Sequence, residues 1–349
     1  MADSEGHSPI SGPLRFRMPG LALVPVMLAV SVLVVACSST PQTTLEPATE
    51  QAERSLNLLM LVFWAGLGVF VVVEGALVYA IVRYRRRPGD GIPTQTHGNH
   101  RLEIAWTIAP AVMVAVLAAF TVPVIFANAN APVDPNPIKV RVIAHQWWFE
   151  FRYPGLGVTT ANEMHIPVGQ EVELQLESED VIHSFWVPAL RGKMDMVPGR
   201  LNRIVITPQK TGTFEGQCAE FCGVAHALMK FTVVVDEPGQ FDAWVARQIE
   251  DRAPPTNLLA EQGEALLVTG GCIACHTIRG TPAQGVIGPD LTHVGSRAKI
   301  AAGVLPNTTD NLASWLRDPQ AVKAGNKMVI RQLGEYEIDA LVTYLQGLK

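Results

Sequence analysis

Apolar residues form three long stretches near the start of the chain. The second and third, residues 56–82 and 104–127, contain one charged side chain in total, Glu74. Each exceeds the roughly 20 apolar residues that a helix needs to cross a bilayer. The pattern therefore predicts two transmembrane helices joined by a loop over 83–103. A carboxyl group is costly in lipid, so we expect Glu74 to face a neighbouring helix, as a polar contact or as a proton site.

The first apolar stretch, within residues 1–36, has the form of a secretory signal peptide. Two arginines precede it, and small residues end it directly before Cys37. The three residues before Cys37, Val-Val-Ala, resemble a bacterial lipobox, which would make Cys37 the lipidated first residue of a lipoprotein. Residues 37–55 then have the composition of an exposed tether, rich in Ser, Thr, Pro and Glu. An uncleaved anchor with a buried Cys37 is the alternative.

The charges around the two predicted helices indicate their orientation. The loop over 83–103 carries five arginines, whereas residues 38–55 carry one arginine among three glutamates. Positively charged loops remain in the cytoplasm. We therefore expect this loop inside the cell, and everything after residue 127 on the periplasmic or extracellular side of a bacterial plasma membrane.

Beyond residue 137 the pattern changes to short segments rich in β-branched and aromatic residues. Six such segments, separated by turns with Pro or Gly, predict an antiparallel β-sandwich over 138–236. A short amphipathic stretch and a Pro-Pro pair predict a linker over 237–256. From 257 to 349, apolar residues recur at helical spacing, which predicts a separate all-α domain.

The composition excludes some classes of function. Of the 349 residues, 17% are charged and 48% are hydrophobic, the mean hydropathy is +0.20, and the formal net charge is −5. A chain with so few charges and no long block of one sign is neither disordered nor suited to nucleic acid. The chemistry must therefore come from motifs in the two exported domains.

The predicted sandwich carries a cluster of metal-binding residue types. Two thiols and two imidazoles would close a tetrahedral zinc site. A methionine nearby favours copper instead, since a thioether is a soft ligand. A disulfide between the two cysteines is a third interpretation. The residues concerned are His183, Cys218, Cys222, His226 and Met229.

Residues 216–229, GQCAEFCGVAHALM, with HSFWVP at 183–188, closely resemble the binuclear copper (CuA) site of cytochrome c oxidase subunit II. The likeness extends from about residue 56 to 235 and implies a cupredoxin-like sandwich. In that family two cysteines bridge two copper ions, each ion binds one histidine, and a methionine and a backbone carbonyl are weak ligands. The matching positions here are His183, Cys218, the carbonyl of Glu220, Cys222, His226 and Met229. The resemblance also implies that the Glu220 carboxylate points to a magnesium ion at the border with subunit I.

Two further positions resemble functional residues of this family. The segment AHQWWF at 144–149 looks like its aromatic patch, in which Trp147 would be the electron entry point beside the copper. The alternative is that these aromatics only pack. The segment RLEIAWT at 101–107 resembles the start of the family's second helix, where an acidic residue, here Glu103, lies at the mouth of a proton channel. An ordinary interfacial glutamate is the alternative.

The all-α domain contains a Cys-x-x-Cys-His motif. This spacing indicates a covalent haem c, with thioether bonds to Cys272 and Cys275 and His276 as an axial ligand. A thioredoxin-like redox pair is the alternative, but no βαβ pattern surrounds the motif. Met328 lies where class I cytochromes c, which this domain resembles, place their second axial ligand. His293 is the other candidate.

These assignments account for all five cysteines, one for lipid, two for copper and two for haem. The resemblance implies subunit II of a haem–copper oxidase with a fused cytochrome c domain, as in caa-type enzymes. Electrons would enter through haem c and the copper pair and reach the oxygen-reducing site of subunit I, coupled to proton translocation. The expected partners are subunits I and III and, as donor, a cytochrome c or an upstream respiratory complex. A membrane-anchored copper carrier or sensor is the alternative.

Overall fold

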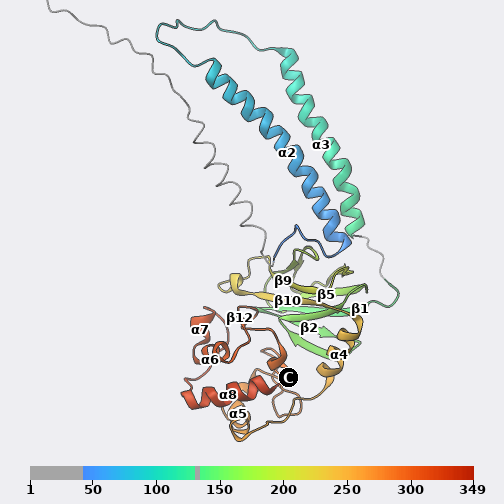
Figure 1. Ribbon diagram of the computed structural model, residues 1–349, viewed down its shortest axis with the longest axis vertical. Coiled ribbons are helices and arrows are strands. Elements are labelled where there is room, and N and C mark those ends of the chain that lie inside the picture. Colours follow the sequence, from blue (N-terminus) through green and yellow to red (C-terminus); the bar gives the residue numbers. More distant parts are fainter. Residues whose placement is uncertain (1–41, 130–133) are drawn as a thin grey trace, which may run out of the picture. The chain divides into compact units, whose positions relative to one another are not determined.

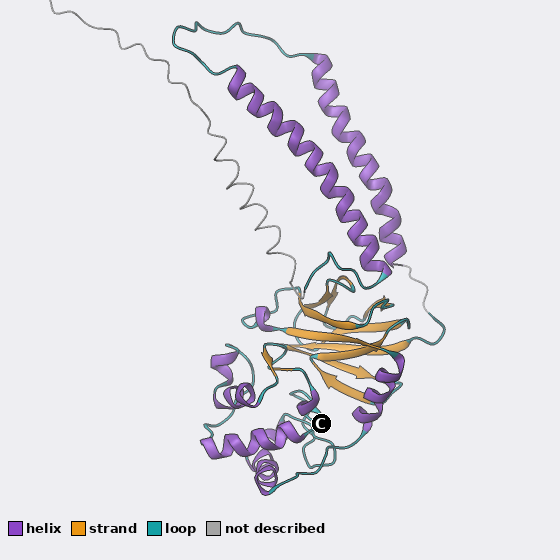
Figure 2. Ribbon diagram, viewed as in Figure 1, coloured by secondary structure: helices purple, strands orange, loops and turns teal. Residues whose placement is uncertain are grey.

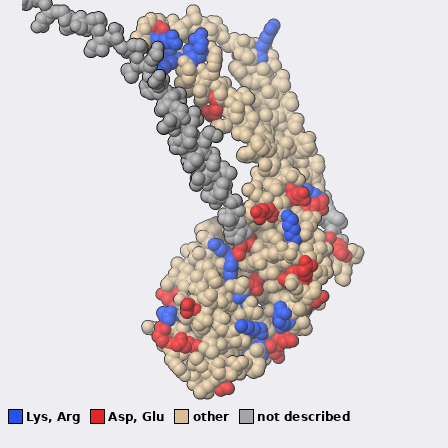
Figure 3. Space-filling view, in the orientation of Figure 1, with Lys and Arg blue, Asp and Glu red and all other residues tan. Residues whose placement is uncertain are grey.

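The computed structural model describes residues 42–129 and 134–349, so the expectations for the signal peptide and Cys37 lie outside the described residues (Figure 1). Both predicted membrane helices are present, as α2 (Glu50–Arg83) and α3 (His100–Ala129). Both are long and apolar enough to span a membrane. Lys and Arg side chains gather at the end of the hairpin that carries the connecting loop, while the helices themselves carry few charges (Figure 3).

Helix α2 begins six residues before the apolar stretch because Thr49 caps it. The Thr49 side-chain oxygen accepts the N–H of Ala52, which satisfies one of the free donors of the first turn. The same hydroxyl donates to the carbonyl of Leu190 in the sandwich. The start of α2 is therefore fixed to the exported domain by hydrogen bonds.

The predicted β-sandwich is confirmed as two packed five-stranded sheets (Figure 2). One sheet has the order β3-β2-β1-β5-β8 and the other β4-β10-β9-β6-β7. Two neighbouring pairs, β1–β5 and β4–β10, are parallel, and the rest are antiparallel. The strands are β1 (Ile138–His145), β2 (Trp148–Tyr153), β3 (Val158–Ala161), β4 (Glu163–Pro167), β5 (Val172–Ser178), β6 (His183–Val187), β7 (Arg191–Met196), β8 (Asn202–Ile206), β9 (Gly212–Cys218) and β10 (Lys230–Asp236).

Aromatic rings fill the space between the two sheets. The ring of Phe231 lies 4.7 Å from those of both Phe149 and Phe185, and all three side chains are buried. Edge-to-face and offset contacts of this kind add to the free energy gained from burial. Gly216 makes room for the cluster, because a Cβ atom there would lie 2.3 Å from the Phe231 ring.

Helix α4 (Pro238–Ile249) covers one edge of the sandwich, although the sequence predicts a linker there. Its Phe241 and Trp244 are buried in the sandwich core. The Trp244 ring stacks on His165 with 4.4 Å between centroids. Much of the expected linker is therefore helical and packs on the sandwich.

His165 lies between two carboxylates at this edge. Its Nδ1 is 2.7 Å from Asp236 and its Nε2 is 3.4 Å from Glu163. Burial disfavours the charged imidazole, but the hydrogen bonds to these carboxylates outweigh it and raise the pKa of His165. The fold is therefore more stable when His165 is protonated.

The C-terminal domain is helical apart from two paired two-residue strands, β11 (Lys299–Ile300) and β12 (Leu305–Pro306). Its helix α8 packs across α5, as the apolar face of the last helix predicts. Gly263 lies at the crossing, where a Cβ atom would be 2.1 Å from the carbonyl oxygen of Ala340. The helices are α5 (Leu258–Thr269), α6 (Thr309–Arg317), α7 (Pro319–Val322) and α8 (Glu335–Gly347).

Candidate copper and haem sites

The predicted copper ligands come from two neighbouring strands and the loop that follows one of them. His183 begins β6 and Cys218 ends β9, and the two strands pair with Phe185 opposite Cys218. The loop 219–225 carries Cys222, and a short 3₁₀ turn, His226–Leu228, precedes Met229. Sheet pairing thus brings His183 to the cysteines although it lies 35 positions earlier in the chain.

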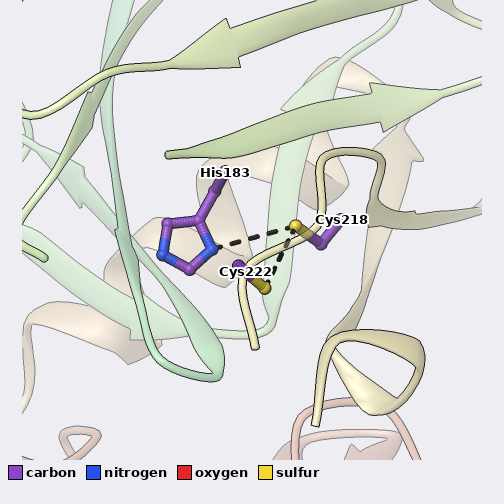
Figure 4. A group of neighbouring side chains, drawn as sticks. All are labelled: His183, Cys218 and Cys222. Atoms are coloured by element: carbon purple, nitrogen blue, oxygen red, sulfur yellow. Dashed lines mark hydrogen bonds between the residues drawn. The ribbon is translucent and has the colours of Figure 1, made fainter. Parts of the chain in front are cut away.

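The ligand atoms meet in a buried cluster (Figure 4). The Sγ atoms of Cys218 and Cys222 are 3.7 Å apart and both residues are free cysteines. The Nδ1 atom of His183 lies 3.8 Å from Cys218 Sγ, and that of His226 lies 3.5 Å from Cys222 Sγ. His183, Cys218, Cys222 and Met229 are all at most 4% exposed. A buried set of thiolate, imidazole and thioether donors suits copper.

The two thiols change each other's acidity. The hydrogen bond between them lowers the pKa of Cys218 and raises that of Cys222. The hydrogen bond therefore favours the thiolate, the form that binds metals, at Cys218.

Asp180 orients the His183 imidazole from behind, a role that sequence reasoning missed. Its Oδ1 lies 2.8 Å from Nε2 of His183, which turns Nδ1 toward Cys218. Burial works against the ionised carboxylate, but hydrogen bonds from His183 and from the N–H groups of Val181 and Gln146 outweigh it and lower the Asp180 pKa to about 2. Such outer partners fix the ring orientation of metal-binding histidines. The only available sequence signal was an acidic residue three positions before the histidine.

Trp147 lies directly against the cysteine loop. Its indole Nε1 donates to the carbonyl of Cys222 at 3.0 Å, and the Gln146 side chain donates to the same oxygen at 2.8 Å. The ring is 8% exposed. Gly223 permits this approach, since a Cβ atom there would be 3.0 Å from the indole. The structure therefore places Trp147 in hydrogen-bond contact with a predicted copper ligand.

Two other predicted residues lie at separate places. The backbone carbonyl of Glu220 is 3.2 Å from Cys218 Sγ, while its carboxylate lies 3.5 Å from Nζ of Lys193. Glu103 is in the first turn of α3, 3.7 Å from His100. Only the carbonyl of Glu220 thus joins the cluster of sulfur and imidazole groups.

The predicted haem ligands line one cavity of about 620 Å³. Cys272 and Cys275 lie on a 3₁₀ turn, and the Nδ1 atom of His276 donates to the carbonyl of Pro289 at 2.8 Å. That bond leaves Nε2 free to bind iron. Gly288 passes flat against the imidazole, since a Cβ atom there would be 2.7 Å from the ring. Met328 lines the same cavity.

His293, the other candidate for the second axial ligand, faces elsewhere. Its Nε2 lies 3.0 Å from the Arg279 guanidinium and 3.1 Å from the carbonyl of Glu250. It is not among the residues that line the cavity. The arrangement favours Met328.

The cavity also offers a hydrogen-bond donor for the propionate groups of a haem. Arg297 lines it, and its Nε is buried without a hydrogen-bond partner. A buried donor needs an acceptor, which a haem propionate would supply. Sequence reasoning missed Arg297 because an isolated arginine carries no motif. The volume, the two thiols, the free imidazole nitrogen and this donor together fit a covalent haem.

Family models match all three parts of the chain. The model described as cytochrome c oxidase subunit II, transmembrane domain, matches residues 24–124, and its periplasmic domain matches 156–236. The cytochrome c model matches 260–349. The matches imply copper and haem c as the cofactors.

Curated relatives match over nearly the whole chain. Cytochrome c oxidase subunit 2 of Alkalihalophilus pseudofirmus is 39% identical over 88% of this chain and 91% of its own length. The protein of that name from Bacillus sp. strain PS3 is 39% identical, over 91% and 95% respectively, and that from Bacillus subtilis is 34% identical, over 94% and 96%. The chain therefore belongs to the cytochrome c oxidase subunit II family, as a membrane protein with a periplasmic copper domain and a fused cytochrome c domain, and is part of an oxidoreductase complex with other oxidase subunits.

Proposed function

We propose that this chain is the electron-entry subunit of a cytochrome c oxidase, with a binuclear CuA centre on Cys218 and Cys222. The observation that carries the proposal is that each of the two cysteine thiols has its own histidine imidazole beside it. Cys218 has the His183 imidazole beside it, and Cys222 has the His226 imidazole. The donor atoms of His183, Cys218 and Cys222 lie within 4.8 Å of one another, in a group that does not include His226. Four donors around one tetrahedral zinc ion would be mutually close.

The weak ligands are paired in the same way. The carbonyl oxygen of Glu220 lies 3.2 Å from Cys218 Sγ, and the Met229 sulfur lies 3.9 Å from Cys222 Sγ. Each cysteine Sγ atom thus has one imidazole and one weak metal ligand beside it. This twofold arrangement supports two copper ions bridged by two thiolates.

The second cofactor would be haem c, which Cys272 and Cys275 would hold through thioether bonds and His276 and Met328 through the iron. Haem and copper supply one-electron chemistry, and the chain holds them in buried sites. Trp147, hydrogen-bonded to the carbonyl of Cys222, is the electron entry point of the copper site. With both cofactors bound, electrons would pass from the haem domain to the copper domain and then to subunit I.

The oxygen-reducing centre belongs to subunit I, because residues 56–82 and 104–127 contain no histidine to bind its haem and copper. The complex translocates protons, with Glu103 at the mouth of a proton channel. The Glu220 carboxylate binds magnesium at the border with subunit I. Subunit III is a further partner, and a cytochrome c or an upstream respiratory complex is the donor.

Electron paramagnetic resonance with near-infrared absorption tests this proposal on the full-length, detergent-solubilised chain. A delocalised two-copper signal is expected, and it should disappear in Cys222→Ser. Cys37→Ser, which removes only the predicted lipid attachment, is the matched control and should retain the signal. A one-copper spectrum, a silent site that holds zinc, or copper that a mild chelator removes within minutes would overturn the proposal.

A further inference from the structure

The segment of the haem domain that carries Met328 lies directly against the copper domain. The Nζ atom of Lys323 donates to the backbone carbonyl of Trp147 at 2.6 Å. The Nζ atom of Lys327 lies 3.7 Å from Oδ2 of Asp180 and 5.8 Å from the centre of the Trp147 ring. Residues 323–328, here called the methionine loop, thus make three polar contacts with two residues of the copper domain.

A glycine allows the methionine loop to approach this closely. Gly325 has a φ of +80°, and a Cβ atom there would lie 2.3 Å from the Val224 side chain. Val224 belongs to the loop between the two cysteines and Met229 that forms the copper site. A side chain at position 325 would therefore have to displace the Val224 side chain.

The copper-domain residues in this contact also touch the predicted copper ligands. Trp147 donates to the carbonyl of Cys222 at 3.0 Å, and Asp180 holds His183 at 2.8 Å. On the haem side, Lys327 is the residue next to Met328. Two series of contacts therefore connect the methionine loop to the copper ligands. One runs through the hydrogen bonds of Lys323 and Trp147, and the other through the ion pair of Lys327 with Asp180 and the hydrogen bond of Asp180 with His183.

The environment of Lys323 is unusual for a lysine. The residue is 3% exposed, and its ammonium group has carbonyl oxygens as neighbours, those of Trp147 and of Ala301, the latter at 3.5 Å. Burial lowers its pKa to about 7, and the charge of the nearby Cys222 offsets only part of this effect. Placing an ammonium group here costs free energy that a methionine of similar length would not. Stability alone therefore does not explain the lysine.

We propose that Lys323 and Lys327 are positioning residues that hold the methionine loop on Trp147 and Asp180 and thereby set the rate of electron transfer from haem to copper. This inference rests on the proposed function. In the step concerned, one electron leaves the ferrous haem, which becomes ferric, and enters the mixed-valence copper pair, which becomes fully reduced. The electron donor of the oxidase supplies the electron that restores the ferrous haem.

Flash photoreduction of the full-length chain loaded with both cofactors tests the inference. A photoexcited flavin reduces the haem, and absorbance then follows haem reoxidation and copper reduction. In Lys323→Met the first-order transfer should slow severalfold, because the rate of electron transfer falls as the methionine loop moves away from the copper domain. The bimolecular reduction of the haem by flavin and both resting spectra should not change. A purely structural role would not produce this division between the two rates.

Two further variants complete the experiment. Lys327→Gln changes a side chain that is 60% exposed, so it should fold even where Lys323→Met does not, and it should also slow the first-order transfer. Lys349→Met, at the exposed C-terminus, is the matched control and should transfer at the unsubstituted rate. Transfer at the unsubstituted rate in Lys323→Met and Lys327→Gln, with both cofactors bound, would overturn the inference. A chain without the two-copper signal or without haem would instead contradict the proposed function, so the two failures are distinguishable.

Discussion

Replacing Asp180 with asparagine should weaken copper binding although it replaces none of the copper ligands. The Asp180 carboxylate accepts three hydrogen bonds, from His183 Nε2 at 2.8 Å and from the N–H groups of Val181 and Gln146 at 2.7 Å each. An asparagine of the same shape has one acceptor oxygen and an amide group that cannot accept. At least one of these donors therefore loses its partner, and the imidazole loses the negative charge behind it.

The expected size follows from the position of the carboxylate. Losing the group that orients a metal-bound histidine typically lowers metal affinity by about 10- to 100-fold. This corresponds to about 1.4 to 2.8 kcal/mol of binding free energy. Titration of copper into the solubilised full-length chain, against a calibrated chelator and read by near-infrared absorption, measures the change. Asp242→Asn, on the exposed side of α4, is the matched control.

An Asp180→Asn chain that binds copper as tightly as the unsubstituted chain, with the same spectrum, would refute this reasoning. His183 would then be held by packing alone. Weakened binding in Asp242→Asn as well would show that the effect comes from net charge and not from the hydrogen bond.

Three other outcomes are expected. The pKa of His165 is raised in the folded state, so the stabilisation that this residue gives is complete below its unfolded pKa of about 6.5 and is lost as the pH rises through its folded pKa. The difference in thermal midpoint between the unsubstituted chain and His165→Gln should therefore shrink as the pH rises through the folded pKa. A difference that stays constant with pH would contradict this prediction. Gly263→Ala should destabilise the haem domain by about 1–3 kcal/mol because the added Cβ would meet the Ala340 carbonyl, whereas Gly239→Ala, with open space around it, should not destabilise it. Denaturation followed through the haem spectrum compares the stabilities of the two variants. Met328→Ala should abolish the methionine-ligated low-spin haem spectrum and leave the copper signal intact, and an unchanged haem spectrum would place the ligand elsewhere.

The β-strands show which elements the pattern of hydrophobic residues predicts and which it misses. Segments with apolar residues facing the core, such as β5 and β10, follow from alternation and β-branched content. The pattern missed β3 and β7, which lie at sheet edges. β7 contains Arg191, Lys193 and Asp195, and charged residues of this kind are common on edge strands because they discourage pairing with other chains.

The sequence by itself determined the parts of this protein whose chemistry is local. Membrane helices follow from the length of apolar stretches, and the haem attachment follows from a five-residue motif. Five of the six predicted copper ligands lie within residues 218–229, so their closeness needs no knowledge of the fold.

Only the tertiary structure decided how these parts are connected. His183 meets Cys218 because β6 pairs with β9, and α4 packs on the sandwich because Trp244 finds His165 there. The contact of Lys323 with the Trp147 carbonyl joins residues 176 positions apart. Such contacts depend on strand pairing and on the packing of one domain against another. Both result from many weak interactions between residues that are distant in the sequence, so a local pattern of residues cannot predict them.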